Sequence, residues 1–182
     1  LNKVLANTLT CNSIYLRQIM QQYAAGKSDD LAYRLARRNA HNADAALSTT
    51  LANMLMEPGH FRKEADVGFR FLVLSHTLLS YLSGLGAHRE TQLPQDVREH
   101  LIEGAGVKLA ASIDEIAQGL ASKSAIAIQS DEEEALANML EQMPDEIDEG
   151  QRLVQTQLAL ICRQLGPLRT LAAHLIKDTS ED

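Results

Sequence analysis

The apolar residues between positions 147 and 175 recur at a spacing that suits one structure, a helix packed along its whole length. The stripe comprises Ile147, Val154, Leu158, Ile161, Leu165, Leu168, Ala172 and Leu175. Its repeat averages about 3.5 residues, as in the seam of a helical bundle. The pattern therefore predicts a long helix over residues 146–176 with one buried face. Pro167 lies inside this stripe, so we expect a kink or a split near Gly166.

Helical spacing continues through the rest of the chain, and no stretch of useful length alternates as a strand would. We therefore predict an all-α fold, an antiparallel bundle of about five to six helices in one domain over residues 1–182. The long helices are expected over residues 2–24, 29–56, 64–87, 94–122 and 146–176, with a short one opening at Asp131–Glu134 and a loop over 123–130. Aromatic residues make up only 4% of the chain, which also favours helices over a β-sandwich.

Two of these helices have apolar stripes that we expect to be buried. The first has Leu5, Leu9, Leu16, Ile19 and Tyr23, with Asn12 in the gap. The second has a seam of small residues, Ala32, Ala36, Ala40 and Ala43, followed by Leu47, Leu51, Met54 and Leu55. Ser28-Asp29-Asp30 offers an N-cap for the second helix, and Pro58-Gly59 ends it.

The charge of the chain argues against nucleic acid as a partner. There are 24 acidic and 17 basic side chains, a net charge of −7, whereas phosphate binding needs a surplus of Lys and Arg. The charges are uneven along the sequence. Residues 1–90 hold 10 basic and 7 acidic side chains, a balance of +3, and residues 91–182 hold 7 and 17, a balance of −10.

The sequence contains no signal peptide and no apolar run of membrane-spanning length. The nearest candidate, residues 71–87, is short and interrupted by polar residues, so we expect a central helix covered by neighbours, with His76 as a core histidine. Cys11 and Cys162 lie far apart and are expected to be buried, reduced thiols. Because the chain begins at Leu1 and its first helix has no N-cap residue, we expect a piece of a longer protein.

No residue spacing indicates an enzyme, a cofactor or a metal. The six histidines provide one Glu-x-x-His string, Glu57-Pro58-Gly59-His60, whose Pro-Gly centre prevents the helical geometry that a di-iron site needs. Zinc, EF-hand, Walker, dinucleotide and nucleophile-elbow motifs are absent. The acidic run 131–134 is interpreted as a solvated first helical turn rather than a cation site.

One polar cluster in the second helix stands out as a candidate site. Its members are Arg34, Arg37, Arg38, His41, Asn42 and Asp44. They form two adjacent ridges at three- and four-residue spacing, beside the alanine seam. Two interpretations remain open. Arg37 and Asp44 could tie this helix to neighbouring helices through ion pairs, with His41 between them, or the arginines could contact an anion or a protein partner.

Residues 31–62 carry a family resemblance. The signature Arg37, Arg38, Ala40, Asp44 and Ala45, the later Glu57-Pro58 and the segment 68–83 resemble the fusaric-acid-resistance-like (FUSC) family of bacterial inner-membrane proteins, in particular its YccS type. The resemblance extends over essentially the whole chain. It implies the C-terminal cytoplasmic domain of an efflux transporter for aromatic or similar organic acids, cut just after the membrane-spanning helices.

The resemblance also implies the partners and the location. The domain would not transport alone, and its role would be assembly or regulation. It would pack against the remainder of its own membrane protein, attached through upstream helices, with a homo-oligomer as a further possibility. The inner membrane would lie beside the basic half, as the positive-inside rule favours. The alternative hypothesis is an autonomous helical-bundle sensor that binds a small ligand or a metal, and an enzyme ranks last.

Overall fold

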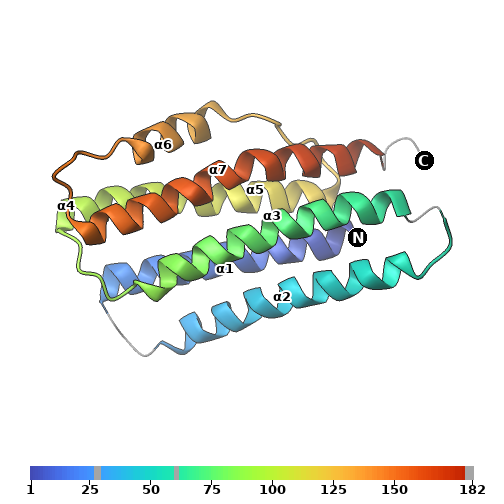
Figure 1. Cartoon of the computed structure of the whole chain (residues 1–182), viewed down its shortest axis with the longest axis horizontal. Coiled ribbons are helices and arrows are strands. Elements are labelled where there is room, and N and C mark those ends of the chain that lie inside the picture. Colours follow the sequence, from blue (N-terminus) through green and yellow to red (C-terminus); the bar gives the residue numbers. More distant parts are fainter. Residues whose placement is uncertain (27–29, 60–61, 179–182) are drawn as a thin grey trace.

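The computed structural model describes residues 1–26, 30–59 and 62–178, so the predicted cap residues Ser28 and Asp29 and the histidine His60 lie outside it. The described chain is an all-α helical bundle, which confirms the predicted fold class (Figure 1). The helices are α1 (Asn2–Ala25), α2 (Leu31–Leu55), α3 (Arg62–Ala87), α4 (Gln95–Arg98), the π-helix η2 (Glu99–Gly106), α5 (Val107–Ser122), α6 (Asp131–Glu141) and α7 (Glu149–Asp178).

The core of the bundle forms around α1, which contacts α2, α3, α5 and η2. Its predicted stripe is buried from Leu5 to Tyr23, and Asn12 is buried within it. α7 packs against α3, α5 and α6, and its predicted seam is buried from Val154 to Leu175. Each fully buried Leu or Ile contributes about 1.5–3 kcal/mol relative to an exposed one, so these two seams dominate the stability of the fold.

The segment predicted as one helix over 94–122 is continuous but not uniformly α-helical. Its middle part, η2, is a π-helix that merges directly into α5. Close packing of α1 against this segment accounts for a glycine there, because a Cβ at Gly106 would overlap the Sδ atom of Met20. The extra residue in a π turn shifts the register of the helix. Leu101, Ile102 and Ala105 of η2 and Leu109 and Ile113 of α5 are all buried.

The predicted split of the last helix at Gly166 is wrong, because α7 runs without interruption through Pro167. Pro167 is exposed, so the hydrogen bond that its ring nitrogen cannot donate is lost on the side of the helix that faces water. The buried residues on either side, Leu165 and Leu168, hold the helix together across this point.

The antiparallel arrangement gives the bundle two distinct ends (Figure 1). At one end α1 begins, α2 connects to α3, and α7 finishes; we call this the termini end. At the opposite end, the far end, α2 begins, α3 connects to α4, and α7 starts. No helix in the described part of the chain combines the length and the apolar composition that a membrane span requires.

Candidate functional site

The polar cluster predicted from the sequence lies on the outer face of α2. The helix begins at Asp30, whose Oδ1 atom accepts a hydrogen bond of 2.8 Å from the backbone N–H of Ala32. The predicted seam is buried at Ala36, Ala40 and Ala43 and continues through Leu47 and Leu51. Ala32 and Leu55, which were expected to belong to it, are exposed, and Met54 is half-buried. This buried stripe turns the opposite face of α2 towards water.

Five of the six predicted site residues share that exposed face. They are Arg34, Arg37, Arg38, His41 and Asn42. None of them lines any of the four cavities found in the described residues, which have volumes of about 310, 370, 490 and 410 Å³. The cluster is therefore a convex helix surface, and such a surface suits a partner of similar size better than a small enclosed ligand.

Asp44 departs from the rest of the cluster. Its carboxylate Oδ2 lies 2.8 Å from Nδ1 of His76 on α3, and its side chain is only 17% exposed. This contact between Asp44 and His76 joins α2 to α3, and the structural and functional interpretations of the arginines stay predictions. The expected core position of His76 is wrong, since its side chain is 65% exposed. The α3 face that carries it, with Val73 64% exposed, is open to solvent.

Beneath the cluster, aromatic rings anchor α2 to the core. The Tyr15 ring of α1 lies 6.0 Å from the Tyr33 ring of α2 and 6.4 Å from the His41 ring, measured between centroids. The guanidinium of Arg89 lies 4.5 Å over the Tyr33 ring, as in a cation–π contact. Burial raises the pKa of the Tyr15 hydroxyl to about 12, although the charge of Arg37 acts in the opposite direction. His41 and Arg37 therefore border the core that positions α2.

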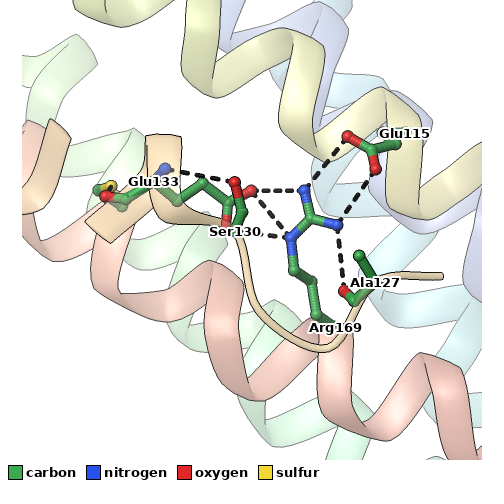
Figure 2. A network of polar contacts seen from close by, with 6 residues as sticks. Glu115, Ala127, Ser130, Glu133 and Arg169 are labelled. Atoms are coloured by element: carbon green, nitrogen blue, oxygen red, sulfur yellow. Dashed lines mark hydrogen bonds and ion pairs between the residues drawn. The ribbon is translucent and has the colours of Figure 1, made fainter. Parts of the chain in front are cut away.

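A second polar network, which sequence reasoning missed, centres on Arg169 of α7 (Figure 2). Its side chain is 2% exposed, and its Nε atom donates to both carboxylate oxygens of Glu133 on α6, at 2.9 and 3.0 Å. The other guanidinium nitrogens reach Glu115 on α5 and the carbonyl of Ala127 in the 123–130 loop, at 3.3–3.4 Å. One arginine thus joins three elements and a loop.

The carboxylates in this network stabilise the charged form of Arg169. Burial alone would lower the pKa of Arg169, but hydrogen bonds to Glu133 and Glu115 outweigh it and raise the pKa above its ordinary value. Glu133 is itself the third residue of α6, where the N-cap Ser130 accepts from its backbone N–H at 3.3 Å. A carboxylate in the first turn of a helix is favoured by the helix dipole.

The thiol of Cys162 completes the network by donating to the backbone carbonyl of Glu133 at 3.2 Å. Burial, and next the negative charge of Glu133, raise the pKa of this thiol to about 12, so it stays protonated at neutral pH. Glu133 and Cys162 also border an adjoining cavity of about 310 Å³. Because Arg169 binds the carboxylate of Glu133 and the thiol of Cys162 binds its backbone carbonyl, the arrangement holds the start of α6 in place.

The start of α6 differs from the solvated turn predicted for residues 131–134. Glu133 is buried against Arg169, and Glu134 pairs with Arg163 of α7, which also binds Glu141 at the other end of α6. One feature of the sequence could have indicated this network. Arg169 lies between Leu165 and Ala172, on the apolar face of its helix. An arginine on a buried face requires a carboxylate partner, and the nearby acidic run supplies one.

No group of three or more His, Cys, Asp or Glu side chains suitable for a metal ion occurs among residues 1–26, 30–59 and 62–178. Cys11 is partly exposed rather than buried as predicted, and Cys162 is buried; both are free thiols, and burial raises the pKa of each.

The fold thus defines an all-helical module with an exposed polar face on α2. Over 90 residues, half of the chain, it is 46% identical to the inner membrane protein YccS of Escherichia coli and 51% identical to an uncharacterized protein of Haemophilus influenzae. An uncharacterized protein, ORF2, of Neisseria gonorrhoeae is 33% identical over 87 residues, or 47% of the chain. No family model and no solved structure matches.

The matched segments are small parts of these relatives. The aligned region covers 12% of the Haemophilus protein, 13% of YccS and 21% of the Neisseria protein. The chain therefore contains a YccS-like region and matches only a small part of the length of these relatives.

Proposed function

We propose that this chain is a helical domain of an inner-membrane transporter of the FUSC type, placed on the cytoplasmic side of the membrane. The similarity to YccS over half of the chain supports this assignment. In this proposal the whole protein exports aromatic or similar organic acids, and the permeation path belongs to its membrane-spanning helices. The bundle described here forms one domain, catalyses no reaction and transports nothing alone; it assembles or regulates the protein.

The proposed assembly surface is the outer face of α2. This helix packs on α1 and α3, and its outer face carries Leu31 and Leu35 with 70% and 52% of their areas exposed. Leu31, Leu35, Arg38 and Asn42 follow one another at three- and four-residue spacing, so they form a single ridge. Exposed leucines beside arginines are characteristic of protein–protein contacts, in which an apolar centre is bordered by polar groups.

The chemistry of the ridge suggests two occupants within the same protein. The leucines would pack on apolar side chains of another cytoplasmic segment or of a second protomer. The arginines would pair with carboxylates, for which their forked geometry is suited. Asp44 has no part in this contact, since it is engaged with His76.

Membrane topology tests the location. We would place an epitope tag after residue 182 of the full-length protein and treat spheroplasts and inverted membrane vesicles with protease. The expected result is a tag that is protected in spheroplasts, degraded in inverted vesicles and present in the inner-membrane fraction. Degradation in intact spheroplasts, or recovery of the native full-length protein outside the membrane fraction, would refute the proposal.

The assembly role requires a separate test. Native electrophoresis of the detergent-extracted full-length protein would compare the wild type with the Leu31→Ser/Leu35→Ser variant, and substituted cysteines on the α2 face would report cross-linking in membranes. We expect the double variant to shift towards a smaller species and to lose cross-links. Saturable binding of a small molecule or a metal by the separate chain, with unchanged assembly, would instead support the sensor alternative.

A further inference from the structure

The termini end of the bundle carries a group of exposed apolar and basic side chains. Four of them surround the connection between α2 and α3, and we call them the tip patch. The tip patch consists of Leu55, Met56, Arg62 and Lys63. Met56 is 88% exposed and Leu55 is 46% exposed, so two large apolar side chains project from the last turn of α2 and the residue after it.

The charge of the terminal helical turns and their connections differs between the two ends. Among the described residues at the start of α1, at the α2–α3 connection and at the end of α7, the basic side chains are Lys3, Arg62, Lys63 and Lys177, and the acidic ones are Glu57, Glu64 and Asp178, a net charge of +1. At the far end the basic side chains are Arg34, Arg89, Arg98 and Arg152, and the acidic ones are Asp30, Glu90, Asp96, Glu141, Asp145, Glu146, Asp148 and Glu149, a net charge of −4.

The path of the chain independently selects the same end. α1 begins and α7 finishes at the termini end, so any further segment joined to either terminus leaves the bundle there (Figure 1). The matched part of YccS is only 13% of that protein, which leaves most of a membrane protein to be attached. A domain attached in this way has its termini end held near the lipid surface.

From these observations we propose that the termini end is the membrane-facing end of the domain and that the tip patch contacts an anionic phospholipid surface. This inference rests on the proposed function. Met56 and Leu55 would enter the interfacial region, while Arg62 and Lys63 would lie among the phosphate groups. Apolar side chains are generally buried at a membrane surface in this way, and basic side chains pair with the lipid phosphates. The acidic far end would be repelled and would point into the solvent. Two carboxylates beyond the described residues, Glu181 and Asp182, act against binding.

The test is sedimentation of the 182-residue chain with sucrose-loaded vesicles. The vesicles contain phosphatidylglycerol and phosphatidylethanolamine in one arm and phosphatidylcholine in the other. We expect several-fold more protein bound to the anionic vesicles, with a decrease as salt is raised. Arg62→Glu/Lys63→Glu should lower binding by about tenfold or more, because each basic group near an anionic surface contributes roughly a factor of five. Met56→Ser should lower binding to both kinds of vesicle.

A matched control separates the tip patch from the overall charge. Lys108→Glu/Arg152→Glu changes the net charge by the same amount at exposed positions away from the termini end and should retain binding. Circular dichroism would verify that all variants keep the helical fold. Equal loss of binding in both double variants, or no preference for anionic vesicles, would overturn the inference. Neither outcome would contradict the proposed function, which the protease experiment tests separately. A domain found outside the cytoplasm would refute the proposed function, even if the chain bound to anionic vesicles.

Discussion

Arg169 of α7 and Glu133 of α6 form a buried bidentate ion pair, with both carboxylate oxygens within 3.0 Å of the guanidinium Nε atom (Figure 2). The two residues are separated by 36 positions in the sequence, and their side chains are 2% and 10% exposed. The pair therefore secures α6 and the loop before it to the bundle in an environment that water hardly reaches.

Breaking this pair from one side should be costly. In Arg169→Met the carboxylate of Glu133 stays buried without its cation, so we expect a loss of about 3–5 kcal/mol in the free energy of unfolding. The double variant Arg169→Met/Glu133→Leu should recover most of that loss, because no unpaired charge remains. Urea denaturation followed by circular dichroism measures both values.

The exposed arginine of the same helix provides the control for this experiment. Arg163 also binds carboxylates of α6, but its side chain is 41% exposed. Arg163→Met should therefore destabilise the domain much less than Arg169→Met, because solvent screens an exposed pair. If Arg163→Met and Arg169→Met were equally destabilising, burial would not be what makes the inner pair important.

The stability of the domain should fall at alkaline pH. Burial raises the pKa of Cys162 and that of Tyr15 to about 12, and it also raises the pKa of Tyr23. Between the unfolded pKa and the folded pKa the unfolded state has released a proton that the folded state retains. The stabilisation is thus complete below about pH 9 and is lost as the pH rises, by about 1.4 kcal/mol per pH unit for each such group.

Chemical denaturation between pH 7.5 and 11 measures this dependence. Cys162→Ala should reduce the slope that begins near pH 9. Tyr15→Phe should reduce the slope that begins near pH 10, because the phenol titrates later in the unfolded chain. A free energy of unfolding that is independent of pH up to 11 would show that these groups ionise in the folded protein as easily as in the unfolded chain.

Two neighbouring glycines of η2 should respond differently to alanine. Gly106→Ala places a methyl group against Met20, so we expect a loss of about 1–3 kcal/mol. Gly104→Ala meets only the carbonyl of Glu99, at 3.4 Å, and should be neutral or stabilising by up to about 1 kcal/mol. Thermal unfolding of both variants gives the comparison, and Met20→Ala should relieve the effect at position 106. Equal effects at the two positions would mean that the contact with α1 does not determine the cost.

The arginines on the outer face of α2 should matter for assembly rather than for folding. Arg37→Ala/Arg38→Ala changes exposed side chains, so the free energy of unfolding should stay within about 0.5 kcal/mol of the wild type. In the full-length protein the same change should weaken the oligomer on native gels. Asp44→Ala, which removes the contact to His76, should instead destabilise the domain. A folding defect in the arginine variant would favour the structural interpretation of the cluster.

The sequence was sufficient for the helices and for most of the core, because apolar spacing depends on the local geometry of each helix. The stripe from Leu5 to Tyr23 and the seam from Val154 to Leu175 are buried as predicted. The π-helix could not be anticipated in this way. It depends on how closely Met20 of α1 approaches Gly106, which is a property of two helices together.

The candidate site was harder to predict than the core, because it depends more on contacts between helices. The exposed face of α2 was correctly separated from its alanine seam, because both follow from one helical wheel. The partner of Asp44, His76, could not be predicted from the sequence, because it depends on where α3 crosses α2. The role of Arg169 depends on its contact with α6. The sequence does not specify where α6 lies relative to α7.

The balance of +3 and −10 between the two sequence halves does not translate into two halves of the molecule. Because the helices are antiparallel, Lys3 and Lys177 end up together at the termini end, and Asp30 and Asp148 together at the far end. The charge difference between the ends is therefore a property of the fold.

The placement of both termini at one end also determines how the bundle responds to mechanical force. Tension between segments joined to α1 and α7 would act on the same end of both helices. Such a load breaks the contacts of these helices one turn after another, and it does not have to break all of them at once. A load applied at the termini would therefore loosen the outermost turns first, near Leu1 and Lys177, while the aromatic anchor at Tyr33 and Arg89 stays intact.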